Sequence, residues 1–432
     1  ASRTGIRFSN YALIQSRCDG DYWRWTISMN FNPSPPTIMH IDLNSCFATV
    51  EQQANPLLRG KPVVVAAYTT PGGCILTASR EAKLLGIATG MRVGEAKVMC
   101  PRVSVLASDP WKYRFINKKL RDLLERYSPN IQVKSIDEMV VDFRDTPEIH
   151  RNQMIEIARK IKQKIKEEIG EWLTASIGIA PNRYLAKVAS GLHKPDGLDV
   201  IDQSNVEQIF SNMQVEDLTG IKSGYGTRLR YVGITTALSF YQAPVSVLTR
   251  AFQSVCGNQW WSRIHGYEVD ETEFETKSIG HSYALRIPYI PSDNRLLQIL
   301  CTLVGKMGRR LRAHGSQAYG MHVSCQYADR GYWHHGIKHQ TALYSNTQLY
   351  AAAKHILLSA PDKPVRILAV SSYLLSDSSA SQLELYSDQI EDRSLTKALD
   401  HIEDRFGDFA IFSARILHMQ DKIHDRIAFG KS

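Results

Sequence analysis

The chain has 432 residues, of which 43% are hydrophobic and 22% charged, so it is long enough for about three domains with buried cores. This composition excludes a single small module, a collagen-like chain and a wholly disordered protein. No run of about 18 uncharged apolar residues predicts a membrane span, and the first residues lack the order of a signal peptide. The seven cysteines are scattered without a C-x-x-C pair, which argues against disulfides or a zinc knuckle and predicts a soluble, cytoplasmic protein.

Hydrophobic periodicity predicts an α+β domain in the first half of the chain. Short apolar runs indicate buried strands, and apolar positions at helical spacing indicate amphipathic helices. Their order, strand, helix, strand, strand, helix, strand, is typical of the ferredoxin-like, split βαβ arrangement. The predicted strands are 36–43, two within 131–143 and 173–180, and the predicted helices are 111–127, 149–169 and 182–193.

Basic residues are concentrated in one part of the chain. The net charge is +9, and residues 277–375 hold twelve basic and three acidic residues, a surplus as large as that of the whole chain. The segment YEVDETEFET before it has no basic residue, which predicts an exposed connector and a domain boundary near 276. Such a basic block suits a phosphate backbone, while a solvated surface without a ligand is the alternative.

Three acidic residues stand at the ends of predicted strands. In a split βαβ sheet the first and third strands are neighbours, so Asp42 on the first would meet Asp137 and Glu138 on the third. Clustered carboxylates need a counter-charge, and oxygen ligands without a neighbouring cysteine suit Mg²⁺. The alternative is a solvated Asp-Glu turn, and because strand residues alternate in direction, both Asp137 and Glu138 reach one site only with a local bend.

Four segments carry a resemblance to a known family. HIDLNSCFATVEQQANPLLRGKPVVV, TASREAKLLGI, SIDEMVVD and SIGIAPNRYLAKVASGLHKPDG occur in this order over about 36–200. Together they resemble the Y-family, lesion-bypass DNA polymerases of the DinB and UmuC type. The clamp motif described below favours a bacterial source. The resemblance extends more loosely to about residue 375.

The resemblance implies a two-metal polymerase site. Asp42, Asp137 and Glu138 match the metal-binding carboxylates, with the carbonyl of Leu43 as a further ligand to two Mg²⁺ ions, Mn²⁺ being left open. Phe47 matches the aromatic steric gate against a 2′-hydroxyl, its alternative being an ordinary packing residue. The nucleotide-binding residues implied are Phe47, Cys46, Thr77, Arg80, Lys83 and Lys194. Arg80 and Lys83 depart from the Tyr and Arg of many members, so the fingers contacts differ in detail.

The resemblance also implies a division into domains. The palm is 36–48 and 109–202, with fingers at 49–108 inserted in it, followed by a thumb at 203–268, a linker at 269–276 and a little finger at 277–376. The thumb segment TGIKSGYGTRLRYVGI resembles a helix-hairpin-helix, although Lys222 replaces the usual second glycine. The DNA-binding residues implied are Gly220, Lys222, Gly224, Arg228, Arg230, Lys277, Ser278 and Arg286.

Residues outside the core are predicted to act in partner binding. In the C-terminal tail, 377–432, SQLELYSD resembles a sliding-clamp binding peptide that presents Gln382, Leu383, Leu385 and Tyr386. Residues 1–35 form an N-terminal extension without a predicted role. The expected partners are primer-template DNA, a dNTP and a sliding clamp, and we expect a monomer. Two rival interpretations are a clamp-bound polymerase-like protein without activity and a DNA-binding module without chemistry.

Overall fold

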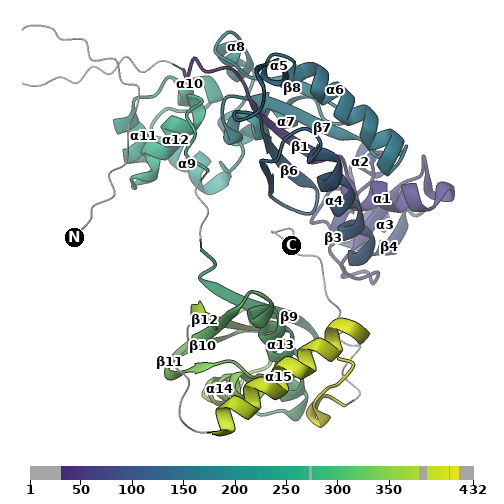
Figure 1. The fold of residues 1–432 in the computed structure, drawn as a ribbon, viewed down its shortest axis with the longest axis vertical. Coiled ribbons are helices and arrows are strands. Elements are labelled where there is room, and N and C mark those ends of the chain that lie inside the picture. The colour runs from purple at the N-terminus through teal and green to yellow at the C-terminus, as the bar shows by residue number, and fades with distance from the viewer. Residues whose placement is uncertain (1–30, 272–274, 379–386, 408, 418–432) are drawn as a thin grey trace, which may run out of the picture. The chain divides into compact units, whose positions relative to one another are not determined.

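The structure is a computed structural model that describes residues 31–271, 275–378, 387–407 and 409–417 (Figure 1). The described chain divides into two compact units. The first contains residues 117–270 and the described residues up to Thr49, and the second contains residues 50–116 and the described residues from Glu271 onward. Among the described helices, none is both long and apolar enough to cross a membrane.

The first unit is built on a five-stranded sheet in the order β5-β6-β1-β7-β8. Strand β1 lies between β6 and β7 and is antiparallel to both, so the predicted neighbourhood of the first and third strands is confirmed. Strand β8 pairs parallel to β7 and adds a fifth strand to the predicted four. The strands are β1 (Ile38–Leu43), β5 (Ile131–Val133), β6 (Glu138–Asp142), β7 (Ala175–Ala180) and β8 (Leu198–Val200).

Helix α7 (Arg183–Leu192) packs on β1, β7 and β8. It begins at Asn182, whose side chain accepts a hydrogen bond from the Leu185 amide and so satisfies one of the free N–H groups of the first turn. Gly178 on β7 allows a close approach, because a Cβ atom there would lie 2.1 Å from the carbonyl oxygen of Ala186. Helix α7 therefore lies directly over the sheet face that will hold the functional site.

The remaining helices of the first unit include one correction. The single helix predicted over 149–169 is three pieces: α5 (Glu148–Arg151), α6 (Met154–Lys164) and a π-helical turn at Ile165–Ile169. The break follows because Asn152 and Gln153 interrupt the apolar face, whereas Met154, Ile157 and Ile161 are buried. Helix α4 (Pro110–Leu124) matches the helix predicted at 111–127.

A cluster of short helices forms the end of the first unit. Their aromatic side chains surround Trp260, whose ring centroid lies 5.9 Å from that of Phe252 and 6.1 Å from that of Phe240. Tyr184 of α7 meets the same ring edge-on at 5.4 Å, which joins these helices to the sheet through α7. The helices are α8 (Val206–Ser211), a 3₁₀ turn at Val215–Asp217, α9 (Ser223–Tyr231), α10 (Ala237–Tyr241), α11 (Val245–Phe252) and α12 (Cys256–Ile264).

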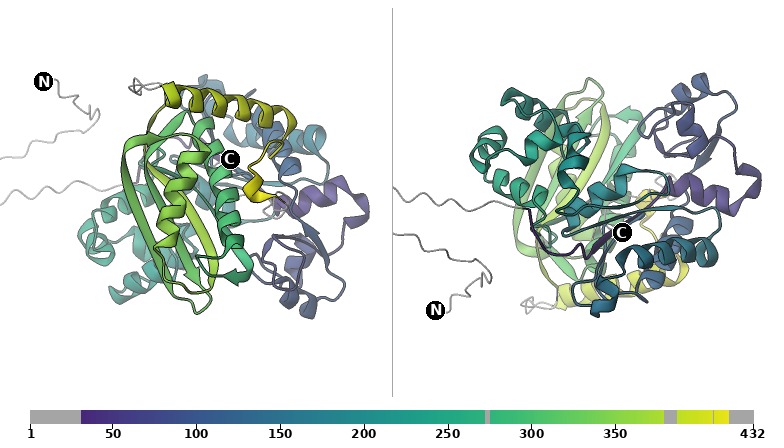
Figure 2. Two further views of the ribbon diagram at one scale, coloured as in Figure 1. Left: turned by 90° about the horizontal axis from the view of Figure 1, so that it is seen from below. Right: turned by 90° about the horizontal axis from the view of Figure 1, so that it is seen from above.

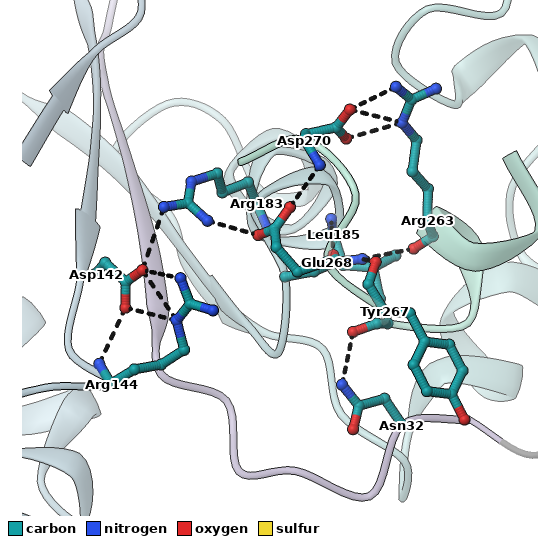
Figure 3. A network of polar contacts seen from close by, with 11 residues as sticks. Asn32, Asp142, Arg144, Arg183, Leu185, Arg263, Tyr267, Glu268 and Asp270 are labelled. Atoms are coloured by element: carbon teal, nitrogen blue, oxygen red, sulfur yellow. Dashed lines mark hydrogen bonds and ion pairs between the residues drawn. The ribbon is translucent and has the colours of Figure 1, made fainter. Parts of the chain in front are cut away.

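An ion-pair network anchors the acidic segment that follows these helices (Figure 3). Arg183 of α7 pairs with Asp142 of β6 at 3.2 Å and with Glu268 at 2.8 Å. Arg263 of α12 donates three hydrogen bonds to Asp270, two from Nε at 2.8 Å and 3.0 Å and one from Nη2. The first part of the acidic connector is thus fastened to the first unit as far as Asp270.

The second unit contains a three-stranded sheet in the order β3-β2-β4. Strand β2 pairs antiparallel with β3 and parallel with β4. Ser79 ends β3 and caps α2, its hydroxyl accepting from the Ala82 amide at 3.3 Å. The elements are α1 (Cys46–Ala54), a 3₁₀ turn at Pro56–Leu58, β2 (Val63–Ala66), β3 (Ile75–Ala78), α2 (Arg80–Leu84), α3 (Val93–Met99) and β4 (Ser104–Ala107).

The chain after the connector forms a four-stranded antiparallel sheet in the order β11-β10-β12-β9. Two helices pack side by side on one face of it (Figure 2), and the side chains of that face form one hydrophobic core. Alternate residues point to the other, uncovered face. The elements are β9 (Ser278–Tyr289), α13 (Asn294–Ala313), β10 (Ser316–Tyr327), β11 (Tyr332–Leu343), α14 (Asn346–Leu358) and β12 (Val365–Asp377).

The interpretation of everything after residue 376 as a tail or linker is wrong for part of that segment. Helix α15 (Ser387–Phe406) lies against α13, and a 3₁₀ turn at Ala414–Ile416 also contacts α13. Arg312 of α13 holds Asp400 of α15 through two hydrogen bonds, at 2.5 Å and 2.7 Å. Charge complementarity between an acidic helix and a basic helix thus fixes a segment whose composition looks like that of a solvated tail.

Candidate active site

Three side chains meet over the central strands of the first sheet. Asp42 on β1 stands opposite Glu138 on β6 in the strand register. Because alternate strand residues share a face, His40 projects to the same side as Asp42. The ligand atoms of His40, Asp42 and Glu138 all lie within 4.8 Å of one another. Two of the three predicted acidic residues are therefore brought together by the pairing of β1 with β6.

Two lysines neutralise this pair of carboxylates. Lys187 of α7 lies 2.6 Å from Oε2 of Glu138, and Lys194, just beyond α7, lies 2.5 Å from Oδ2 of Asp42. Burial raises the pKa of Asp42, and the charge and hydrogen bond of Lys194 only partly oppose that rise. The Asp42 carboxylate, which is costly to ionise and is matched by a half-exposed lysine, favours a further positive charge at this site.

His40 is the buried member of the cluster. Its side chain is 2% exposed, with Nε2 3.7 Å from Glu138, and neither ring nitrogen has a hydrogen-bond partner among the described residues. Burial, and next the charges of Lys187 and Lys194, lower the pKa of His40 to about 3. The ring is therefore neutral and adds polarity beneath the carboxylates without adding charge.

The third predicted acidic residue, Asp137, lies beside the cluster rather than in it. It precedes β6, its Oδ1 accepts a hydrogen bond from Ser135 at 2.6 Å, and its carbonyl accepts from the Leu43 amide at 3.0 Å. Burial, and the charge of Glu138, raise the pKa of Asp137. Adjacent residues of a regular strand point to opposite faces, so Asp137 and Glu138 can approach one site only where the chain bends. Asp137 lies in the turn before β6, and this turn supplies the bend.

The donor set fits a divalent cation. Asp42, Glu138 and the adjacent Asp137 offer hard carboxylate oxygens, which Mg²⁺ and Mn²⁺ prefer. The positive charge that these acids attract is at present supplied by Lys187 and Lys194, whose side chains are 37% and 41% exposed and can turn toward solvent. Leu43, whose carbonyl was predicted to be a further ligand, is buried at the end of β1.

Comparison with known proteins identifies the family. The model of the impB/mucB/samB family matches residues 41–191, and that of its C-terminal domain matches residues 276–385. The chain is 33% identical to DNA polymerase IV of Moorella thermoacetica over 88% of this chain and 95% of that protein, and 30% identical to DNA polymerase IV 2 of Bacillus subtilis over 90% and 97%.

Solved structures agree with this match. A Y-family DNA polymerase chimera built on Dbh superposes with a TM-score of 0.69 at 26% identity, over 78% of this chain and 98% of the chimera. The chain belongs to the Y-family of translesion DNA polymerases. Other similar structures are an insertion ternary complex and a post-insertion binary complex of Dbh DNA polymerase. The carboxylates of this polymerase therefore lie in a fold that performs DNA-directed DNA synthesis.

The predicted nucleotide-binding residues of the polymerase fall in both units. Phe47 and Cys46 begin α1 beside the acids, and both are buried. Burial, and next the charge of Asp137, raise the pKa of the Cys46 thiol, which keeps it neutral. Thr77 lies on β3, and Arg80 and Lys83 are exposed on α2. The roles of these residues stay predictions.

The segment that was predicted to be a DNA-binding hairpin forms a turn that leads into α9, and its role stays a prediction. Gly220 has φ of +89°, which a side chain would strain, and Lys222 precedes α9 as its N-cap residue. Gly224 faces open space. Arg230, however, pairs with Glu216, and Arg228 donates to the Phe252 carbonyl at 3.4 Å, so in this structure both arginines hold the helices together.

The basic block of the polymerase is likewise only partly available to a ligand. Lys277, Ser278 and Arg286 are exposed at the start of and along β9. Arg309 pairs with Glu403 and Asp404 of α15, and Arg312 with Asp400. These acidic partners lie after residue 375, so the charge count over 277–375 did not include them and overstated the basic surface that is open to a ligand. The predicted clamp-binding residues Gln382, Leu383, Leu385 and Tyr386 lie outside the described residues.

Sequence reasoning missed His40, Lys187 and Asn44. Lys187 could have been found from its spacing, because Arg183 and Lys187 are one helical turn apart and both face acids of β6. His40 could have been found from the alternation that places it on the face of Asp42. Asn44 gave no signal of this kind, since its contacts are with distant parts of the chain.

Proposed function

We propose that the polymerase adds dNTPs to a primer 3′ end by two-metal nucleotidyl transfer, with Asp42, Asp137, Glu138 and the Leu43 carbonyl holding two Mg²⁺ ions or, in their place, Mn²⁺. The observation that carries this proposal is the pairing of Asp42 with Glu138 across β1 and β6 under two lysines. Two such ions, when bound, stabilise the charge on the attacking and leaving oxygens. The carboxylates position them, and the neutral His40 keeps water from the rear of the site.

Lys194, which pairs with Asp42 in this structure, is proposed to bind the triphosphate instead when a nucleotide is present. Lys194 is 41% exposed, so its ammonium group is free to move from the carboxylate to a phosphate when a metal replaces it. Arg80, Lys83 and Thr77 are proposed to contact the phosphates from α2 and β3. Phe47, buried in α1 five residues after Asp42, is proposed to lie under the sugar with Cys46 beside it and to reject a 2′-hydroxyl by contact.

The DNA-binding surfaces are proposed on two domains. In the thumb, 203–268, the turn from Gly220 to Gly224 offers backbone N–H groups at the start of α9 to a phosphate. In the little finger, the sheet face opposite α13 and α14 carries small residues such as Ser282 and Ser324, which both pair with Ala369, and Ser371 two residues along β12. A nucleic-acid backbone is proposed to pass over this face. Lys277, Ser278 and Arg286 border this face on β9.

The domain limits follow from this assignment. We propose a palm at 36–48 and 109–202, fingers at 49–108, and a little finger at 277–376 extended by α15, which packs on α13. The segment 269–276 links thumb and little finger after its anchor at Asp270. A sliding clamp is proposed to bind the segment 382–386, and the polymerase is proposed to act as a monomer on DNA in the bacterial cytoplasm.

Primer extension tests the proposal directly. The protein is given a primed template with Mg²⁺ and all four dNTPs, once with an intact template and once with an abasic site. Extension on both templates is expected, with frequent misincorporation, and no addition to the intact template would overturn the proposal. Asp137→Ala should abolish extension and retain DNA affinity, whereas Asp404→Ala, an exposed acid on α15, serves as the matched control that extends normally.

A further inference from the structure

Asn44 makes hydrogen bonds to two distant parts of the chain. It lies two residues after Asp42 and is 8% exposed. Its Nδ2 donates to Ser176 Oγ at 2.9 Å, and its Oδ1 accepts from Thr174 Oγ1 at 3.1 Å and from the Asp196 amide at 2.8 Å. A buried amide with this many partners fixes the segments that it joins.

One of these segments is the loop that carries Lys194. The loop turns sharply after α7: Asp196 has φ of +61°, and a Cβ atom on Gly197 would lie 2.5 Å from the His193 carbonyl oxygen. A non-glycine residue in the left-handed region persists only where its surroundings hold it. The Asp196 amide is the group that Asn44 holds, so Asn44 acts on the strained residue itself.

The same loop is held from its other side. The Asp196 carboxylate pairs with Lys162 at 3.1 Å and with Lys166 at 3.2 Å, and both lysines belong to the helical segment of α6 and the turn after it. The Gly197 amide donates to Ser176 Oγ at 3.3 Å. The loop is therefore fixed between α6 and the start of β7, and Asn44 is its link to the strand that carries Asp42.

We propose that Asn44 is a positioning residue that sets the distance between Lys194 and the carboxylate of Asp42. This inference rests on the proposed role of Lys194 in triphosphate binding. With the Asp196 amide held by Asn44, the backbone of Lys194 is fixed relative to β1, so its ammonium group reaches either Asp42 or a phosphate bound in front of it. Without that bond the loop relaxes, and the lysine loses the pre-organisation that favours nucleotide binding.

The test measures dNTP affinity without chemistry. A dideoxy-terminated primer on a template is bound to the full-length protein, and the Kd of the correct dNTP is measured in Mg²⁺. Asn44→Leu keeps the volume and removes all three side-chain hydrogen bonds, including the one to the Asp196 amide. It should raise the Kd by about three- to tenfold, the effect on Lys194 of losing the bond to the Asp196 amide. Asn44→Asp keeps an acceptor for the Asp196 amide and should restore the Kd to within about twofold of the parent protein.

A double variant separates positioning from general damage. In a Lys194→Met background, Asn44→Leu should not raise the Kd further, because the lysine that Asn44 positions is gone. An additive rise, or an unchanged Kd in Asn44→Leu alone, overturns the inference. If Lys194→Met leaves the Kd unchanged, the proposed role of Lys194 fails and the inference fails with it, whereas primer extension by the parent protein still decides the polymerase activity.

Folding is controlled by thermal melting of each variant. If Asn44→Leu does not fold, Asn44→Ser replaces it, since serine is polar but too short to reach the Asp196 amide. Asn44→Ser should raise the Kd of the dNTP in the parent background and leave this Kd unchanged in the Lys194→Met background. Any other result overturns the inference.

Discussion

The ion pairs over β1 and β6 and those between α13 and α15 both join basic side chains to carboxylates, but they differ in burial. The Lys194 side chain is 41% exposed at its pair with Asp42, whereas the Arg312 side chain is 3% exposed at its pair with Asp400. A half-exposed lysine can leave its partner for solvent or for a phosphate at little cost. A buried guanidinium that leaves its partner remains as an uncompensated charge.

This difference shows how a functional charge can be told from a structural one. Lys194 and Arg312 are alike in that both lie in segments that the sequence marked as candidate sites. The exchangeable pair of Lys194 includes Asp42, whose ionisation is costly because burial raises its pKa. The buried pair of Arg312 with Asp400 instead holds α15 against α13. Variants at both kinds of site test this distinction, from the largest expected effect to the smallest.

Asp42→Asn should have the largest effect. Removing one carboxylate charge at the metal site is expected to lower kcat for nucleotide addition by about 1,000-fold, the upper range for losing one preorganised electrostatic group. Asp400→Asn, which removes a carboxylate of the buried class, should leave kcat unchanged. Single-turnover extension of a primed template measures both. A comparable loss in the two variants would erase the distinction between the regions.

Asp142→Asn should destabilise the first unit. Asp142 pairs with Arg144 at 2.5 Å and with Arg183 at 3.2 Å, and the loss of a partner to a mostly buried arginine costs about 3 kcal/mol in the free energy of unfolding. Urea denaturation at pH 7 measures this, with the exposed Asp145→Asn as the control. An equal, small effect in both variants would contradict the structural role of the network in Figure 3.

The same pair has a pH signature. Burial opposes the ionisation of Asp142, but its hydrogen bonds to Arg144 and the charge of Arg183 outweigh it and lower the pKa of the carboxyl. A carboxyl with a lowered pKa stabilises the fold above its unfolded value of 3.8, and this stability is lost as the pH falls through the folded value. The parent protein should therefore lose stability below pH 4 more steeply than Asp142→Asn.

Phe47→Ala should relax sugar selection. Removing the ring that is proposed to contact the sugar is expected to lower the preference for dNTP over rNTP by about 10- to 100-fold, as for other steric contacts of this size. The ratio of kcat/KM values for dCTP and CTP opposite guanine measures it. Phe143→Leu, at a buried aromatic residue on the sheet, is the matched control and should keep the preference. Unchanged discrimination in Phe47→Ala would leave Phe47 as an ordinary packing residue.

Arg286→Gln and Arg309→Gln compare an exposed arginine with an ion-paired arginine within the little finger. Arg286 is exposed on β9, and Arg309 is engaged with α15. Loss of one phosphate contact should reduce the slope of log Kd against log salt by about 1 in Arg286→Gln. The slope should not change in Arg309→Gln, although its melting temperature should fall. A salt titration of duplex binding by fluorescence anisotropy decides it.

Much of the active site could be predicted from particular residues. Asp42 and Glu138 were found because the alternation of apolar residues gave the strands and the order of elements made those strands neighbours, which the register confirms. The helix at 149–169 was predicted as one piece because periodicity does not register the polar break at Asn152 and Gln153. Lys187 was missed because a lysine on a helix is usually solvated.

The amino-acid sequence by itself determined the family, the strand order and the acidic pair, because these follow from local periodicity and from motifs of adjacent residues. Only the tertiary structure decided which basic groups are free. Arg312 finds Asp400 and Asn44 finds the Asp196 amide across 88 and 152 residues of chain. Such contacts depend on how helices and loops pack, so the spacing of residues along the chain does not predict them.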